Sequence, residues 1–337
     1  MINHLSSSPE SSAQRPSLPS MRRRRLLAHL ASRRAELLAA VLELNRRALT
    51  QESFLDAWTV KDALAHIAAW DRWEHRQMRR MLREEPPSEV AVNAFNALAV
   101  TEWRHRSLGD VLAELQDARS SWVDWLTDLT DDAFFRNRPF DDWDWAFPNC
   151  LEIQWQHDAE HAAQIAAWRE ARAGESSAGP KEVLLAALSA ARKELVASAA
   201  LVPREERETR PVCGVWTLKD VAGHLVDWEK VGARGLRSMA CGQPPAVPHI
   251  PDIERWNQQH AQAREDHAWG DVWHELRGTR VDLVEVVADT DQENLARSHV
   301  FPWGSEGTAY EWISVFIRHD REHAQLLREA LGAELDA

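Results

Sequence analysis

The chain contains few cysteines. Its three, Cys150, Cys213 and Cys241, are odd in number and lie far apart in a sequence of 337 residues. This pattern excludes a disulfide framework and suits a reducing compartment, so we expect a cytoplasmic protein. Stability must then come from an apolar core. Hydrophobic residues make up 44% of the sequence, which is enough for two domains of ordinary size.

Positive charge and long apolar runs are also scarce. Lys and Arg number 40 against 53 Asp and Glu, which leaves a net charge of −13. Because proteins that bind phosphate backbones need clustered positive charge, this balance excludes a general nucleic-acid partner. No apolar run approaches the roughly 20 residues that cross a bilayer, so no membrane partner is expected. Residues 1–20 are rich in Ser and Pro without an apolar signal core, and they are predicted to form a disordered leader.

What the chain does contain is a repeat. Residues 58–70 read W-T-V-K-D-A-L-A-H-I-A-A-W, and residues 216–228 read W-T-L-K-D-V-A-G-H-L-V-D-W. Trp, Thr, Lys, Asp, His and Trp thus recur at identical spacing. A second pair of motifs, H-D-A-E-H at 157–161 and H-D-R-E-H at 319–323, lies near the end of each half. The chain is therefore predicted to be one His-bearing helical unit present twice.

Apolar spacing and helix breakers predict four helices in each unit. In the first unit they cover about 21–49, 59 to the Pro86-Pro87 pair, 108–129 and 151–173. In the second unit, the later three run from 217 to the Pro244-Pro245 pair, over 269–288 and over 310–331. The Thr and Asp of the repeated motif, Thr59 with Asp62 and Thr217 with Asp220, are typical of capping boxes at the start of a helix.

The expected fold class is all-α, with two tandem four-helix bundles at 21–173 and 181–337. A flexible linker is predicted at 174–180, where Gly, Ser and Pro gather. No segment shows a convincing alternating strand pattern. The run Arg22 to Arg25 is interpreted as a solvated helix start, because no aromatic or basic residues extend it into a nucleic-acid surface.

The repeated histidines are the candidate chemistry. His66 and His224 share an apolar helical stripe and should point inward, and histidines four residues apart lie on one helix face. Since the second and fourth helices of a bundle can be neighbours, three imidazoles should meet in each unit and form a three-nitrogen site of the catalytic zinc type. The alternative is a group of core histidines bonded to carbonyls, but three buried imidazoles without a shared partner would be costly. The predicted metal ligands are His66, His157 and His161 in the first unit and His224, His319 and His323 in the second.

Residues next to these histidines are candidates for supporting roles. Asp158, Glu160, Asp320 and Glu322 are predicted either to orient an imidazole or to accept a proton near bound water, and the alternative is that they face solvent. Trp70 and Trp228, one turn after the helix-two histidines, are candidate walls of a substrate pocket, although packing alone would also explain them. Cys150 has Trp312 at the corresponding position of the second unit, so we interpret it as a core or loop cysteine and not as a repeated ligand.

These motifs resemble those of the DinB-like superfamily of metal-binding four-helix bundles, which includes the N-terminal domain of mycothiol-dependent maleylpyruvate isomerase. The resemblance rests on W-T-x-x-D-x-x-x-H-x-x-x-W and H-D-x-E-H and covers residues 21–331. It implies a divalent metal, zinc or nickel, held by the six histidines named above, and chemistry on low-molecular-weight thiols such as mycothiol or bacillithiol, or on reactive electrophiles. Members of that superfamily often pair as homodimers. Two bundles in one chain imply a monomer with an intramolecular pseudo-dimer.

Two functional hypotheses follow. The first is a metal-dependent enzyme of thiol-transferase, isomerase or hydrolase type that acts in detoxification, with metal lowering the pKa of a bound water or thiol. The alternative is a non-catalytic or metal-free protein of the same fold that binds a small molecule and protects the cell from it. A purely structural role for the six histidines remains a third reading, in which their replacement affects only stability.

Overall fold

A computed structural model describes residues 20–140, 143–172, 178–302 and 304–332. The predicted leader 1–20 and the first part of the predicted linker 174–180 lie outside the described residues, except for Ser20. The first half contains α1 (Met21–Ala40), α2 (Arg46–Thr50), α3 (Val60–Leu82), α4 (Val92–Trp103), α5 (Leu108–Asp128), α6 (Asp131–Phe135) and α7 (Phe147–Glu170). The second contains α8 (Lys181–Ala199), α9 (Leu218–Ala240), α10 (Ile253–Ala263), α11 (Trp269–Asp289), α12 (Gln292–Ala296) and α13 (Ala309–Ala330).

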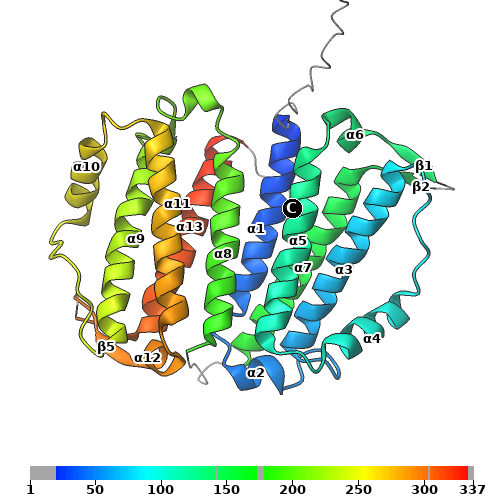
Figure 1. Cartoon of the computed structure of the whole chain (residues 1–337), viewed down its shortest axis with the longest axis horizontal. Helices are drawn as coiled ribbons and strands as arrows, with labels where there is room; N and C mark the ends of the chain where they lie inside the picture. The colour runs from blue at the N-terminus through cyan, green and yellow to red at the C-terminus, as the bar shows by residue number, and fades with distance from the viewer. Residues whose placement is uncertain (1–19, 141–142, 173–177, 303, 333–337) are drawn as a thin grey trace, which may run out of the picture.

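The long helices form two four-helix bundles, which confirms the predicted fold class. In the first, α1 packs on α7 and α3 packs on α5; in the second, α8 packs on α13 and α9 packs on α11 (Figure 1). Buried aliphatic residues on the inner stripe of each helix, such as Leu64 and Leu225, fill the space between them. Within the described residues, no helix is long and apolar enough to cross a membrane.

Three short antiparallel hairpins accompany the helices: β1 (Arg138–Phe140) with β2 (Trp143–Trp145), β3 (Pro211–Cys213) with β4 (Trp216–Thr217), and β5 (Ser298–Val300) with β6 (Glu306–Thr308). No sequence pattern predicted these hairpins. Strands of two or three residues are too short to show a periodic alternation, so the pattern that predicts longer strands is missing here.

Side-chain caps explain where several helices begin. Thr59 accepts a hydrogen bond from the backbone of Asp62 while Asp62 accepts one from the Thr59 backbone, and Thr217 with Asp220 repeats this arrangement. Both predicted capping boxes are therefore confirmed. The predicted helix 21–49 is wrong in one respect: α1 ends at Ala40, and Asn45 starts α2 by accepting from the Ala48 amide at 2.8 Å. Asn competes with the backbone for hydrogen bonds and therefore favours such a cap.

Three other predicted helix limits differ from the structure by several residues. α3 and α9 end at Leu82 and Ala240, several residues before their proline pairs. α7 begins at Phe147 and includes Pro148 in its first turn, where a missing backbone N–H costs nothing.

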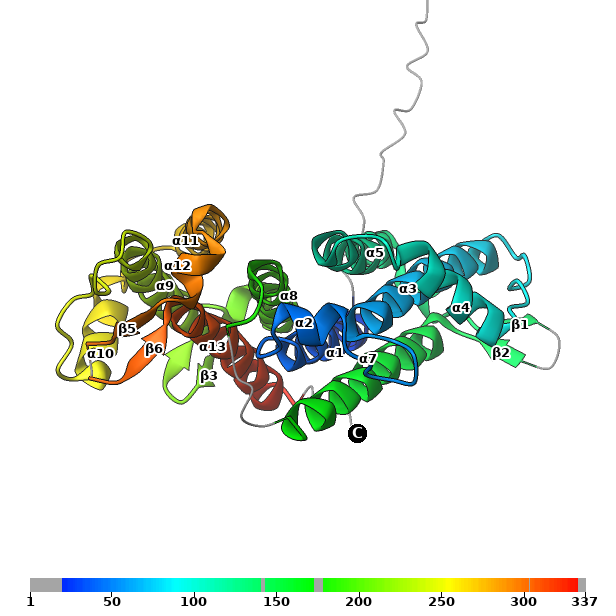
Figure 2. The same cartoon turned by 90° about the horizontal axis from the view of Figure 1, so that it is seen from below.

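The two halves meet along α1 and α8, which lie side by side at the centre of the molecule (Figures 1 and 2). Ala28 of α1 and Leu201 form a buried apolar cluster there. The Tyr310 hydroxyl donates to the Leu42 carbonyl at 2.7 Å, a buried contact between residues of different halves. The largest core cluster also contains residues from both halves, so the bundles share one apolar interior.

The arginine run at the start of α1 is not simply solvated. Arg23 is fully buried, donates to the Leu129 carbonyl and pairs with Asp131. Arg24 donates to the Ala200 carbonyl at 3.0 Å, across the interface between the halves. The prediction of a solvated run is therefore wrong for these two residues, because the start of α1 lies in contact with other parts of the fold.

Candidate metal centres

Three imidazoles converge in the first half. His66 comes from α3, whereas His157 and His161 come from successive turns of α7. The Nε2 atom of His157 lies 3.0 Å from Nε2 of His66 and 3.1 Å from Nε2 of His161. α3 and α7 pack against each other, and the four-residue spacing places both α7 histidines on the face that meets His66.

The second half repeats this geometry. His224 comes from α9, and His319 and His323 come from α13. Nε2 of His319 lies 2.8 Å from Nε2 of His224 and 3.2 Å from Nε2 of His323. In each half the three ligand atoms lie within 4.8 Å of one another, as the repeated spacing predicted. The two sets are named the first triad and the second triad below.

The tryptophans of the repeated motif surround the triads. The Trp58 ring lies 5.0 Å from the His66 ring, and the Trp216 ring lies at the same distance from His224. Trp58 and Trp216 were not among the predicted site residues, although their recurrence at the start of both motifs was a signal for them. Each of the predicted pocket tryptophans is held by an asparagine: Trp70 Nε1 donates to Asn96 at 2.9 Å, and Trp228 Nε1 donates to Asn257 at 3.0 Å.

Comparison with known protein families agrees with this repeated geometry. A model of the DinB superfamily matches residues 23–165 and, separately, residues 187–327. The chain belongs to the DinB superfamily. Each match includes one complete triad. No curated protein and no solved structure was found to match the chain.

Burial disfavours the charged form of all six imidazoles of this DinB protein. Burial, followed by repulsion from His161 and His66, lowers the pKa of His157 to about 3. Burial, followed by the neighbouring imidazoles, likewise lowers the pKa of His224 to about 3. The pKa values of the other triad histidines are also lowered, in each case mainly by burial. A neutral imidazole with its proton on Nδ1 presents an Nε2 lone pair, which is the form that binds a metal.

The donor set fits a divalent cation. When the proton of each ring is on Nδ1, three lone pairs face one another in each half, and a cation between them would turn this repulsion into attraction. Nitrogens bound to zinc in a tetrahedral site are about 3.3 Å apart, given bond lengths of roughly 2.0–2.1 Å. The observed spacings of 2.8–3.2 Å between neighbouring Nε2 atoms are close to this value. All donors of both triads are imidazole nitrogens, a set that suits several divalent transition metals.

The predicted orienting role of Asp158 and Asp320 is wrong. Asp158 is fully buried and accepts two hydrogen bonds from Arg34 and one from Arg119, at 3.0–3.1 Å. Asp320 accepts from Arg192 and Arg280 in the same manner. Both carboxylates follow a triad histidine directly, so the next position on the helix points toward the bundle axis and away from the imidazoles.

These aspartates belong to two buried ion clusters. The first ion quartet consists of Arg34, Asp71, Arg119 and Asp158, one residue from each of α1, α3, α5 and α7. The second ion quartet consists of Arg192, Glu229, Arg280 and Asp320, from α8, α9, α11 and α13. Burial alone would lower the pKa of Arg34, but Asp158 and Asp71 outweigh it and raise that pKa above the ordinary value. Each quartet ties four helices together beside a triad.

Glu160 and Glu322 remain near the triads. Glu160 is exposed and accepts from Gln164 at 3.1 Å, and Glu322 lines a cavity with His319. The Nδ1 atoms of His66, His161, His224 and His323 are buried without a hydrogen bond of normal geometry among the described residues, although the side chains of Asn96, Gln164 and Asn257 lie close enough to His66, His161 and His224 to raise their pKa values against the effect of burial. Metal-bound histidines usually donate from this atom to an acceptor. Packing against Trp58 and Trp216, together with the nearby Asn96 and Asn257 side chains, limits the orientation of His66 and His224.

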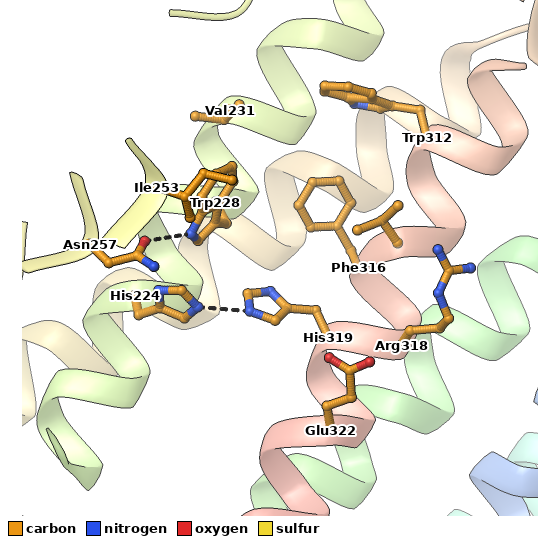
Figure 3. A pocket seen from close by; sticks show the side chains of 11 residues that line it. His224, Trp228, Val231, Ile253, Asn257, Trp312, Phe316, Arg318, His319 and Glu322 are labelled. Carbon is orange, nitrogen blue, oxygen red and sulfur yellow. Dashed lines mark hydrogen bonds between the residues drawn. The ribbon is translucent and has the colours of Figure 1, made fainter. Parts of the chain in front are cut away.

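A cavity of about 430 Å³ opens over the second triad. His224 and His319 form one side of it, and Trp228 lies beside them with its indole held by Asn257 (Figure 3). Phe316 and Trp312 from α13 and Ile253 from α10 complete the apolar wall. This volume lies in the range of small-molecule sites, and the few polar groups are at the histidine end. Arg318 and Glu322 supply the only charged side chains of the described lining.

Proposed function

We propose that each half binds one divalent metal ion, zinc or nickel, through the three Nε2 atoms of its triad. We further propose that the protein is a metal-dependent enzyme acting on low-molecular-weight thiols, such as mycothiol or bacillithiol, or on reactive small electrophiles. The observation that carries the proposal is the convergence of three neutral imidazoles in both halves, from the same helices and the same motif positions. Helix bundles fold without such histidine clusters, so the presence of one in each half indicates a functional role.

A metal bound there would lower the pKa of a coordinated water or thiol and supply a nucleophile near neutral pH. The chain itself would provide a proton acceptor and an apolar cavity for the substrate. Glu322 lies on the cavity with its carboxylate near His319 and is the candidate proton acceptor in the second half; Glu160 holds the corresponding position in the first. The aromatic cavity would exclude water from a reactive group and hold an apolar substrate against the triad.

Metal analysis of protein purified without a polyhistidine tag tests the proposal. We expect two metal ions per chain, one after His161→Ala, one after His323→Ala, and none after both substitutions. His274→Ala is the matched control, because His274 is exposed on α11 and lies outside both triads. If the native protein holds no metal, and added zinc or nickel does not raise its melting temperature, the proposal fails.

The alternative is a metal-free binder that protects by sequestering a small molecule. The apolar cavity of the second half supports this reading, because apolar walls alone bind an apolar ligand. Replacing His319 and His323 together by Ala distinguishes the two. Enzymatic turnover of a thiol conjugate should be lost after this change, whereas sequestration of the same compound in the cavity should persist.

We also propose that the chain is a monomer whose halves take the place of two subunits. The support is the packing of α1 on α8 and the apolar cluster shared by both halves. Light scattering during size-exclusion chromatography should give a mass near 38.4 kDa. A mass of twice this value would contradict the proposal. A cytoplasmic location, argued from the few unpaired cysteines, is part of the same proposal.

A further inference from the structure

The lining of the cavity over the second triad, called the second cavity below, divides into repeated and unrepeated residues. The repeated ones keep their type at the corresponding motif position of the first half: His224 and His66, Trp228 and Trp70, Asn257 and Asn96, His319 and His157, Glu322 and Glu160. Ile253 and Val315 correspond to Val92 and Ile153 and so stay aliphatic, whereas the remaining four lining residues change in kind. Val231, Trp312, Phe316 and Arg318 correspond to Trp73, Cys150, Gln154 and Gln156. Lining residues present in both halves would serve a reaction common to both triads. Lining residues present in one half only would select the ligand that this half binds.

The unrepeated aromatic wall is built into the packing of α9 on α13. A Cβ atom at Gly232 would lie 2.2 Å from the Phe316 ring, and one at Gly235 would lie 2.8 Å from Trp312. The Trp312 indole also donates to the Gly232 carbonyl at 3.1 Å. Both rings occupy their positions only because α9 carries glycine there. The wall is therefore formed before any ligand arrives, which lowers the entropic cost of binding.

The first half has a polar interior at the same level. Glu74 stands where the second half has Gly232, and Cys150 and Gln154 stand where it has Trp312 and Phe316. All three are buried. Burial raises the pKa of Glu74 to about 7, and its carboxyl group is hydrogen-bonded to Cys150. Each half thus has a histidine triad, but the side chains that would surround a substrate beside it differ. We therefore expect the second cavity to have a ligand specificity of its own.

Arg318 is the positively charged residue of the cavity lining. It lies on α13 at the edge of the cavity, one residue before His319, and is exposed. Among the described residues it has no ion-pair partner, whereas most buried arginines of this protein have one. Glu322 is repeated in the first half and belongs to the shared set. The guanidinium is therefore the one charged group of the lining that is both unpaired and particular to this cavity.

We propose that the second cavity binds an organic anion with a flat apolar body, such as an aryl carboxylate or sulfonate. Phe316, Trp312 and Trp228 would pack on the apolar body, and Arg318 would donate hydrogen bonds to the anionic group. This inference rests on the proposed function for the use of the site, since it names the class of substrate presented to the second triad. The binding step itself needs only the cavity and Arg318.

Calorimetric titration with a matched pair of ligands tests this. The probes are 2-naphthylacetate and the neutral 2-(2-naphthyl)ethanol, which share an aromatic body and differ in charge. The native protein should bind the acid about tenfold more tightly, as one charge-assisted contact at a partly exposed site predicts. Arg318→Gln, which introduces the residue of the first half, should remove this preference and leave affinity for the alcohol unchanged. Arg277→Gln, at an exposed arginine on α11 outside the cavity, is the matched control and should change neither.

Repeating the titrations with chelator-treated protein separates this inference from the metal proposal. A preference for the acid that needs Arg318 and survives chelation supports the inference, even if no metal binds to either triad. A preference that chelation removes and Arg318→Gln leaves intact would mean that the carboxylate binds the metal, which overturns the role of Arg318 and supports the metal proposal. Equal affinity of the native protein for acid and alcohol, or no binding of either, would overturn the inference outright.

Discussion

Replacing Arg34 by Met tests how much the first ion quartet contributes to stability. The Arg34 guanidinium donates to Asp158 at 3.0 and 3.1 Å, to Asp71 at 2.9 Å and to the Leu115 carbonyl at 2.9 Å. Met keeps most of the apolar volume of the side chain but removes all four hydrogen bonds and the charge. Two fully buried carboxylates would then share the single positive charge of Arg119.

The expected loss is about 3–5 kcal/mol of unfolding free energy, because removing one partner leaves an uncompensated buried charge. The sign of the effect does not depend on whether the intact quartet is itself stabilising. A double substitution distinguishes the effect of the charge imbalance from the effect of the lost hydrogen bonds. Adding Asp158→Asn to Arg34→Met restores charge neutrality and leaves the Arg119–Asp71 pair, at 2.7 Å, in place. The double variant should therefore be more stable than Arg34→Met alone.

Urea unfolding followed by circular dichroism gives these free energies. Arg33→Met is the matched control, since Arg33 lies on the same helix but its ion pair with Glu36 is partly exposed and should contribute less than about 1 kcal/mol. A loss below about 1 kcal/mol for Arg34→Met would refute the reasoning. A double variant less stable than Arg34→Met would also refute the reasoning, because charge imbalance would then not be the cause of the lost stability.

Three further predictions concern single side chains. Burial raises the pKa of Glu74 from 4.5 to about 7, so the folded state keeps a proton that the unfolded chain releases, and the contribution of this group to stability should fall by about 3 kcal/mol between pH 4.5 and 7. The buried histidines, whose pKa values are lowered, give the opposite slope in both proteins, so the measurement is the difference in urea unfolding free energy between the native protein and Glu74→Gln, which should shift against the native protein from pH 5 to pH 8. Tyr310→Phe removes the donor to the Leu42 carbonyl and should cost about 1 kcal/mol, measured as a lower urea midpoint, whereas an unchanged midpoint would show that this bond between the halves adds nothing. Thr59→Ala breaks a capping box and should cost about 1 kcal/mol, with Thr59→Ser as the control that keeps the hydroxyl and restores most of it.

Local patterns of the sequence predicted the helices and much of the candidate sites. The four-residue spacing of His157 and His161 is a property of one helix, and the inward direction of His66 follows from its apolar stripe. Their meeting was predicted by one additional step, that two helices of a bundle can be neighbours. The repeat supported this step because the same three positions recur in the second half. The capping boxes at Thr59 and Thr217 were equally local, since a cap involves residues only three positions apart.

The ion quartets were not predicted, although Arg34 and Arg192 occupy matching positions. Residues of the first quartet are 37 to 124 positions apart and come from four helices. No local periodicity distinguishes a charged residue that reaches such a partner from one that faces solvent. That is why the sequence left Asp158 a candidate to orient an imidazole, to accept a proton or to face solvent, whereas it is found bonded to arginines.

The sequence by itself determined the helical periodicity, the duplication and the identity of the converging histidines, because helix hydrogen bonds and side-chain directions are set within a turn or two of chain. Tertiary structure alone decided which buried charges pair, and that glycines on α9 leave room for Phe316 and Trp312 beside the second triad. Such features depend on the rotation and depth at which one helix packs on another. Those quantities result from all the side chains of the interface together, and no short segment encodes them.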